Sequence, residues 1–205
     1  MTLRLALLGD SIGYGIGAAR TDDTLAPRLA ADLARYGRPS QTRVFAMPGA
    51  RSADLAAQVV RAVPWRTDIA VIVIGANDLT RLVPVAQAAG QLRRAVRSLR
   101  AAGAQVVVAP APDLSVLPHV PPVMRELVQT GSRLLRQAQL DATIAEGGRV
   151  ADVEGTTSAA FARDRSLFSG DRFHPSSAGY AMIADALAPA VRAAADDLGP
   201  VDQAG

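Results

Sequence analysis

The sequence predicts an α/β fold built from βα units around a parallel sheet of five strands. Its 205 residues are close to the usual size of one domain. Short apolar runs alternate with longer amphipathic stretches, which is the pattern of βα units. One run, Ile69–Ile74, is apolar at every position, as expected for a central strand that is buried on both faces.

The elements follow one another along the chain in a regular order. The predicted strands are Leu3–Leu8, Arg43–Met47, Ile69–Ile74, Gln105–Ala109 and Arg149–Val153. The predicted helices are about Thr24–Tyr36, Ser52–Val63, Val85–Ala102, Pro122–Ala145 and Ser176–Asp196. Gly103 follows the third helix, where a left-handed C-cap is expected. Residues 1–197 form the predicted single domain, and we expect residues 198–205 to be a flexible tail.

Two long segments, Pro110–Pro122 and Glu154–Phe173, are predicted to be irregular. The first is apolar and rich in proline, and the second carries three of the four phenylalanines. Long loops in a compact domain commonly carry function, so both segments are candidates for contact with a substrate.

The composition excludes several kinds of chemistry. The chain has no cysteine and no lysine, so disulfides, thiolate metal sites, cysteine nucleophiles, Schiff bases and phosphate-binding P-loops are excluded. The net charge is +3, and the densest basic cluster comprises Arg93, Arg94, Arg97 and Arg100. We interpret this cluster as a solvated helix face, with an anion-binding patch as the alternative. Because no nucleic-acid recognition motif accompanies it, we expect no nucleic-acid binding.

The chain also lacks the signals of membrane insertion and export. No apolar run reaches the roughly 18 residues that a transmembrane helix requires. Leu5–Leu8 is too short for the core of a signal peptide, so we expect a cytoplasmic protein.

The end of the first strand matches two different motifs. Gly9-x-Ser11-x-Gly13 has the spacing of a nucleophile elbow, in which small residues allow a tight turn that exposes the serine hydroxyl. Gly13-x-Gly15-x-x-Ala18 fits a dinucleotide fingerprint, but that motif also needs an acidic residue at the end of the second strand, where this chain has none. A glycine-rich turn without catalytic function is the remaining alternative to the elbow.

A serine nucleophile needs a base, and only two histidines are present. His174 has Asp171 three residues before it, close enough to orient its ring. Pro175 disfavours a helical conformation at His174 and suits the first helical position, so we expect His174 just before the last helix. His119 lies among prolines, and we interpret it as a structural or lid residue.

Asn77 and Gly49 follow two further strands. In a sheet of order 2-1-3-4-5, the crevice opens where strands 1 and 3 part, beyond their carboxyl ends. Ser11 leaves strand 1, Asn77 leaves strand 3, and Gly49 leaves strand 2 on the other side of strand 1. The Asn77 amide and the Gly49 N–H are therefore predicted to converge beside Ser11, as an oxyanion hole requires.

Four segments in this order resemble the conserved blocks of the SGNH (GDSL-like) hydrolase family. These segments are GDSIG, PGARSADL, IGAND and DRFHPSSAGY, which lie between Gly9 and Tyr180. In one place the chain departs from the family, which often carries an asparagine shortly before the glycine of the second block. Here that stretch reads VFAMP, so we do not expect the usual hydrogen-bond support of the loop.

The resemblance implies a role for each matching residue. Ser11 would be the nucleophile and His174 the base, oriented by Asp171. Gly49 and Asn77 would join the Ser11 N–H in the oxyanion hole. The resemblance also implies a three-layer α/β/α sandwich with a five-stranded parallel sheet, which agrees with the five predicted strands.

The expected activity is hydrolysis of short-chain acyl esters, because the chain is small and shows no inserted lid domain. The candidate substrate-binding residues are Leu114, Leu117, His119, Phe168 and Phe173. Four related activities stay open, namely acyl transfer to an alcohol or sugar, carbohydrate deacetylation, thioester cleavage and lysophospholipid cleavage. A non-catalytic binding module is the alternative outside enzymology. We expect no cofactor and no metal, and we interpret Asp22-Asp23 and Asp196-Asp197 as solvated residues.

Overall fold

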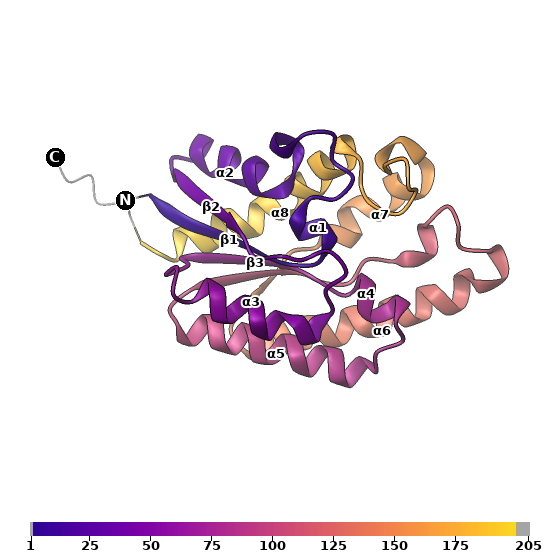
Figure 1. The fold of residues 1–205 in the computed structure, drawn as a ribbon, viewed down its shortest axis with the longest axis horizontal. Helices are drawn as coiled ribbons and strands as arrows, with labels where there is room; N and C mark the ends of the chain where they lie inside the picture. Colours follow the sequence, from indigo (N-terminus) through magenta and orange to yellow (C-terminus); the bar gives the residue numbers. More distant parts are fainter. Residues whose placement is uncertain (1, 200–205) are drawn as a thin grey trace.

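A computed structural model describes residues 2–199 of the chain and contains the predicted parallel sheet. All neighbouring strands are parallel, and their order is β2-β1-β3-β4-β5, which confirms the predicted order. Figure 1 shows β2, β1 and β3 next to one another in this order. The strands are β1 (Leu3–Gly9), β2 (Ser40–Val44), β3 (Ile69–Val73), β4 (Gln105–Ala109) and β5 (Arg149–Val150).

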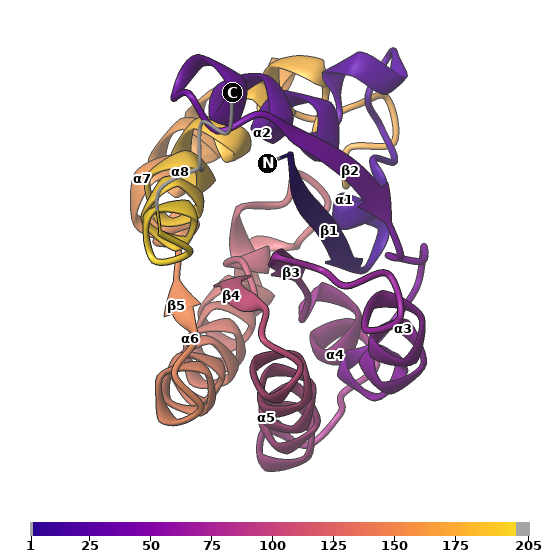
Figure 2. The same ribbon diagram turned by 90° about the vertical axis from the view of Figure 1, so that its left-hand side faces the viewer.

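Helices cover both faces of this sheet (Figure 2). The helices on one face are α2 (Leu25–Arg35), α7 (Val153–Arg163) and α8 (Ser177–Asp196). Those on the other are α3 (Leu55–Ala62), α5 (Val85–Ala101) and α6 (Pro122–Ala145). Two short helices, α1 (Ser11–Tyr14) and α4 (Ala76–Thr80), follow β1 and β3 directly. The fold is therefore the three-layer α/β/α sandwich that the sequence predicts.

The two-residue period of the strands divides the core into two layers. On β1, Leu5 and Leu7 pack in the cluster that contains α2 and α8, whereas Ala6 and Leu8 pack in the cluster that contains α3 and α5. Every residue of Ile69–Val73 is buried, which confirms the prediction of a central strand covered on both faces.

The second strand was predicted at the wrong residues. It covers Ser40–Val44 and not Arg43–Met47. This strand lies at the sheet edge and is mostly exposed, so it needs no apolar pattern. Its ladder ends because the N–H groups of Phe45 and Ala46 both donate to Leu7 O, at 2.7 and 3.1 Å.

Helix α7 replaces part of a segment that was predicted to be irregular, and the fifth strand is correspondingly shorter than predicted. The Asp152 carboxylate accepts the Gly155 N–H at 2.9 Å and caps the helix. Within α7 only Thr157 and Phe161 are buried, so the sequence shows no apolar stripe that would predict it. The segment Pro110–Pro122 is irregular as predicted, apart from a single 3₁₀ turn at Leu114–Val116.

The structure also refines the predictions at both ends of α8, for Pro175 before the helix and for the predicted tail after it. Ser176 is the N-cap, accepting the Gly179 N–H at 3.3 Å, so Pro175 lies two residues before the helix and not at its first position. Beyond the helix, Leu198 packs against the core and Arg38 Nη1 donates to Gly199 O at 2.8 Å. The rest of the predicted tail, residues 200–205, lies outside the described residues. No helix within residues 2–199 has the length and hydropathy of a membrane span.

Candidate active site

Ser11 lies at the turn between β1 and α1, at the carboxyl edge of the sheet. Ser11 is the first residue of α1 and is 6% exposed. Asp10 caps this helix by accepting the Ile12 N–H at 3.0 Å. Gly9 has φ +121°, and a Cβ there would lie 1.8 Å from Val73 O. Only glycine fits this approach, so the sequence Gly-Asp-Ser produces the sharp turn that presents the serine.

His174 and Asp171 form a hydrogen-bonded chain with Ser11. His174 Nε2 lies 2.8 Å from Ser11 Oγ, and His174 Nδ1 lies 2.6 Å from Asp171 Oδ2. The other carboxylate oxygen, Oδ1, accepts N–H groups of Phe173 and His174 at 2.9 Å and the Ser169 hydroxyl at 2.8 Å. Desolvation favours a higher pKa for Asp171, but these hydrogen bonds outweigh it and hold the pKa far below its ordinary value. Asp171 is therefore ionised.

Two contacts bring the beginning and the end of the chain together at this point. A Cβ on Gly17 would lie 2.4 Å from Pro175 O and 2.9 Å from His174 Cβ, so the segment after α1 packs directly against the histidine. The hydroxyl of Tyr180, on α8, donates to Ile16 O at 2.8 Å. Tyr180 is fully buried, and burial raises its pKa, so the phenol stays protonated and keeps this bond.

Asn77 and Gly49 lie on turns that are bonded to each other. Asn77 Nδ2 donates to Ala50 O at 3.0 Å, which links the β3–α4 turn to the loop after β2. Gly49 has φ +78°, and a Cβ there would meet no atom within 4 Å. Within residues 2–199, neither the Gly49 N–H nor the Ser11 N–H has a hydrogen-bond partner. Donors of an oxyanion hole must be left unbonded by the fold, and these two N–H groups meet that requirement.

Two buried carboxyls lie beneath these turns. Asp78 is fully buried and accepts the Ser52 N–H and hydroxyl, at 3.1 and 2.9 Å. Burial raises the pKa of Asp78, although the bonds from Ser52 oppose the shift. Burial likewise raises the pKa of Asp10 to about 7, against the Ile12 N–H and with a further contribution from the charge of Asp78. Two acidic groups close together in the interior disfavour full ionisation of both.

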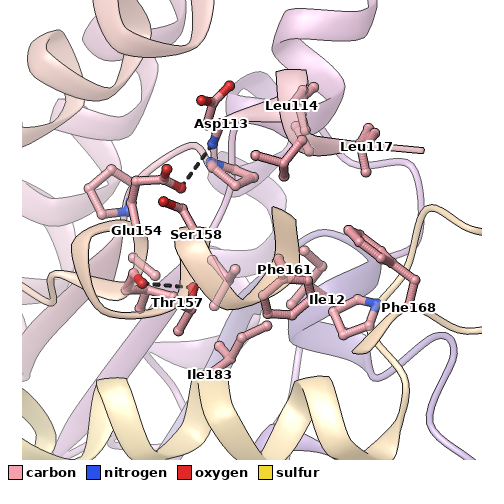
Figure 3. A pocket seen from close by; sticks show the side chains of 18 of the residues that line it. Ile12, Asp113, Leu114, Leu117, Glu154, Thr157, Ser158, Phe161, Phe168 and Ile183 are labelled. Carbon is pink, nitrogen blue, oxygen red and sulfur yellow. Dashed lines mark hydrogen bonds between the residues drawn. The ribbon is translucent and has the colours of Figure 1, made fainter. Parts of the chain in front are cut away.

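An apolar pocket adjoins this site (Figure 3). Its cavity volume is small, about 100 Å³, and it opens to solvent. Ile12 and Pro175 line it, next in sequence to Ser11 and His174. Aromatic and aliphatic side chains from α7, α8 and the two predicted loops complete the wall, including Phe161, Ile183, Leu114, Leu117, Phe168 and Phe173. Figure 3 shows the polar side chains of Asp113, Glu154 and Ser158 at the end away from Ile12 and Phe168.

The structure thus brings most of the predicted site residues together. Ser11, Asp171 and His174 are joined by hydrogen bonds, and the Asn77 side chain is bonded to the loop of Gly49. Four of the five candidate substrate-binding residues line the pocket. The fifth, His119, is exposed and does not line it, but its ring stacks on Phe173 with centroids 6.1 Å apart.

Sequence reasoning missed four buried residues that support the turns of the site. Asp10 and Asp78 are adjacent to motif residues, but their burial has no signature in the local pattern. Gln58 and Tyr180 bond to turns 49 and 164 residues away in the chain, so only the folded structure reveals them.

Comparisons with known proteins agree with this geometry. Residues 7–182 match the model of the GDSL-like Lipase/Acylhydrolase family. The GDSL-like esterase Rv1075c of Mycobacterium tuberculosis is 37% identical over 194 residues, which are 93% of this chain and 62% of that protein. The chain therefore spans less than two thirds of that relative's length.

Several solved structures share the fold. TesA has a TM-score of 0.77 and 21% identity, over 93% of this chain and 99% of that one. The esterase EstA from Pseudoalteromonas sp. has a TM-score of 0.67 and 17% identity, over 94% and 98% of the two chains. Axe2, an acetylxylan esterase from Geobacillus stearothermophilus, has a TM-score of 0.70 and 19% identity, over 92% and 94%. Because the family match extends from β1 into α8 and includes all four motif segments, this chain belongs to the GDSL-like lipase/acylhydrolase family.

Proposed function

We propose that this chain is a serine esterase in which Ser11 is the nucleophile, His174 the general base and Asp171 the orienting carboxylate. One observation carries the proposal, the continuous hydrogen-bond chain from Asp171 through both ring nitrogens of His174 to Ser11 Oγ. With Asp171 ionised, Nδ1 carries the proton and Nε2 is free to accept the serine proton.

The reaction would proceed in two stages. Ser11 Oγ attacks the ester carbonyl while His174 Nε2 accepts its proton, and the imidazolium then protonates the departing alcohol. The acyl group stays on Ser11 as an ester. A water molecule, deprotonated by His174, attacks this acyl-enzyme and releases the carboxylic acid.

The oxyanion of each tetrahedral intermediate would be bound by the N–H groups of Ser11 and Gly49 and by the Asn77 amide. The two free backbone N–H groups support this assignment. Asn77 contributes one N–H to Ala50 O, which orients its amide and leaves the second N–H for the substrate.

The preferred substrates would be carboxylic esters with short acyl chains. The apolar pocket next to Ser11 supports an apolar acyl group, and Leu117 and Phe173 are among the residues that line it. Two structural neighbours named above are esterases, one of them an acetylxylan esterase. We therefore expect acetyl and butyryl esters to be the preferred substrates.

An activated-serine probe and a set of p-nitrophenyl esters test this proposal. A fluorophosphonate should label wild-type protein on Ser11, and Ser11→Ala should lose both labelling and ester turnover while its melting temperature stays unchanged. Ser98→Ala, which changes an exposed serine on α5, is the matched control and should behave as wild type. Turnover that survives in Ser11→Ala would refute the mechanism. A rise in kcat/KM from acetate to octanoate would refute the short-chain preference, and product analysis with an added alcohol separates hydrolysis from acyl transfer.

A further inference from the structure

Gln58 is a buried residue of α3 that makes two hydrogen bonds to a single backbone residue near Ser11. It is 1% exposed. Its Oε1 accepts the Gly9 N–H at 2.7 Å, and its Nε2 donates to Gly9 O at 2.8 Å. We propose that Gln58 is a positioning residue for catalysis, one that fixes the turn carrying Ser11 and the loop carrying Gly49. This inference rests on the proposed function.

The turn before Ser11 is closely fitted and needs an anchor. Gly9 lies against Val73 at the end of β3, so a side chain would clash there. Its φ of +121° is also one that other residues rarely adopt. The Asp10 N–H donates to Val73 O at 3.1 Å, so the chain turns away from the sheet immediately after Gly9. The Gly9 N–H has Gln58 Oε1 as its acceptor. Without the Gln58 amide, this buried N–H would be left without a partner.

Gly9 also connects the two sides of the proposed oxyanion hole. Its carbonyl accepts the Met47 N–H at 3.0 Å in addition to Gln58 Nε2. Met47 lies two residues before Gly49, just as Gly9 lies two residues before Ser11. Gln58 therefore holds a residue, Gly9, through which the nucleophile turn and the Gly49 loop are hydrogen-bonded. These bonds support the loop that carries Gly49.

The expected consequence is a loss of turnover with little loss of substrate binding. Gln58 touches neither the pocket nor the reacting atoms, so KM should be nearly unchanged. Misplacement of reacting groups by about 1 Å can cost about 10²-fold in rate. We therefore expect Gln58→Met, which has a similar shape but no hydrogen bonds, to lower kcat by about 10- to 100-fold with KM within about threefold.

A second variant provides a readout that general destabilisation would not reproduce. A protonated glutamate at position 58 has one acceptor oxygen and one O–H donor, and it can make both bonds to Gly9. An ionised glutamate can only accept, and it would face Gly9 O without a donor. For Gln58→Glu, the ratio of its kcat to that of wild type should therefore rise as the pH falls from about 8 to about 5. Each kcat is normalised to active sites titrated with the fluorophosphonate.

Thr67→Val is the matched control. Thr67 lies just before β3, at the amino ends of the strands, whereas Ser11 lies at their carboxyl ends. Thr67 is buried, and its hydroxyl donates to Ala62 O at 2.9 Å. Its loss should lower the melting temperature and leave kcat within about twofold of wild type, because a distant buried hydrogen bond contributes only to stability. Amide hydrogen exchange at Gly9 and Met47 should become faster in Gln58→Met and stay unchanged in Thr67→Val.

The outcomes separate this proposal from the proposed function. A wild-type protein that neither turns over esters nor labels at Ser11 would overturn the proposed function. An active wild type whose Gln58→Met variant folds and keeps kcat would overturn the role of Gln58, as would an equal loss of kcat in Thr67→Val. If Gln58→Met does not fold, a pH-independent ratio for Gln58→Glu overturns it instead.

Discussion

Replacing Asp171 by asparagine tests the proposed orientation of His174 with almost no change in shape. The side-chain oxygen of asparagine can keep the bonds that Oδ1 now accepts from Ser169, Phe173 and His174. The amide nitrogen then faces His174 Nδ1, where Oδ2 now lies at 2.6 Å. Because two N–H donors cannot bond to each other, the imidazole shifts to the tautomer with its proton on Nε2. That tautomer cannot accept the Ser11 proton.

The structure sets the size of the expected loss. In a fully buried Ser-His-Asp triad, the same substitution lowers kcat by about 10⁴. Here the Asp171 side chain is 46% exposed, while that of His174 is 18% exposed. Water at this exposed edge can hydrogen-bond to Nδ1 and partly restore the useful tautomer. We therefore expect kcat to fall about 10²- to 10³-fold, which is less than for a buried triad.

Steady-state hydrolysis of p-nitrophenyl butyrate measures this loss, and Asp164→Asn is the matched control. Asp164 lies seven residues before Asp171 and also accepts a serine hydroxyl and a backbone N–H, from Ser166, but it contacts no histidine. Its variant should keep wild-type kcat. An Asp171→Asn protein with kcat within about threefold of wild type would refute the orienting role, since general-base catalysis contributes at least about 10²-fold.

Two further substitutions test the proposed oxyanion hole and the buried carboxyl. Asn77→Ala should lower kcat about 10²- to 10³-fold, as expected for an oxyanion donor, and steady-state assays that find full activity would remove Asn77 from the mechanism. Asp10→Asn should stabilise the protein more at about pH 8 than at about pH 4.5. Burial raises the pKa of Asp10 to about 7. The protonated carboxyl therefore contributes to the free energy of unfolding below about pH 4. This contribution is lost as the pH rises from about 4 towards 7, by at most about 4 kcal/mol. Urea unfolding of both proteins at the two pH values measures this difference, and an equal difference at both would contradict the assignment.

The elements that the sequence predicts correctly are those whose burial requires a regular pattern of apolar residues. Ile69–Val73 is enclosed on both faces, and its apolar run locates it almost to the residue. Ser40–Val44 lies at the sheet edge, where backbone hydrogen bonds to β1 are sufficient and polar side chains are tolerated. Helix α7 buries only two side chains and begins at a capping aspartate, so its residues show no period that could distinguish it from a loop.

The same distinction applies to the candidate site. Ser11 and Asn77 directly follow predicted strands, and the parallel topology alone places both turns at one edge of the sheet. Asp171 and His174 are three residues apart, so their contact is local. Gln58 is different, because its partner Gly9 is 49 residues away and an isolated glutamine in a helix gives no sign of its contacts.

The contacts missed by sequence reasoning explain how a site made of turns keeps its geometry. The turns that carry proposed catalytic groups are bonded to one another or to helix α8, and not only to neighbouring strands. Met47 N–H binds Gly9 O, Asn77 Nδ2 binds Ala50 O, and the Tyr180 hydroxyl binds Ile16 O. Groups joined in one network of contacts do not contribute independently. A change in one turn therefore displaces the groups of the next, and the cost of a double substitution across these bonds should differ from the sum of the single ones.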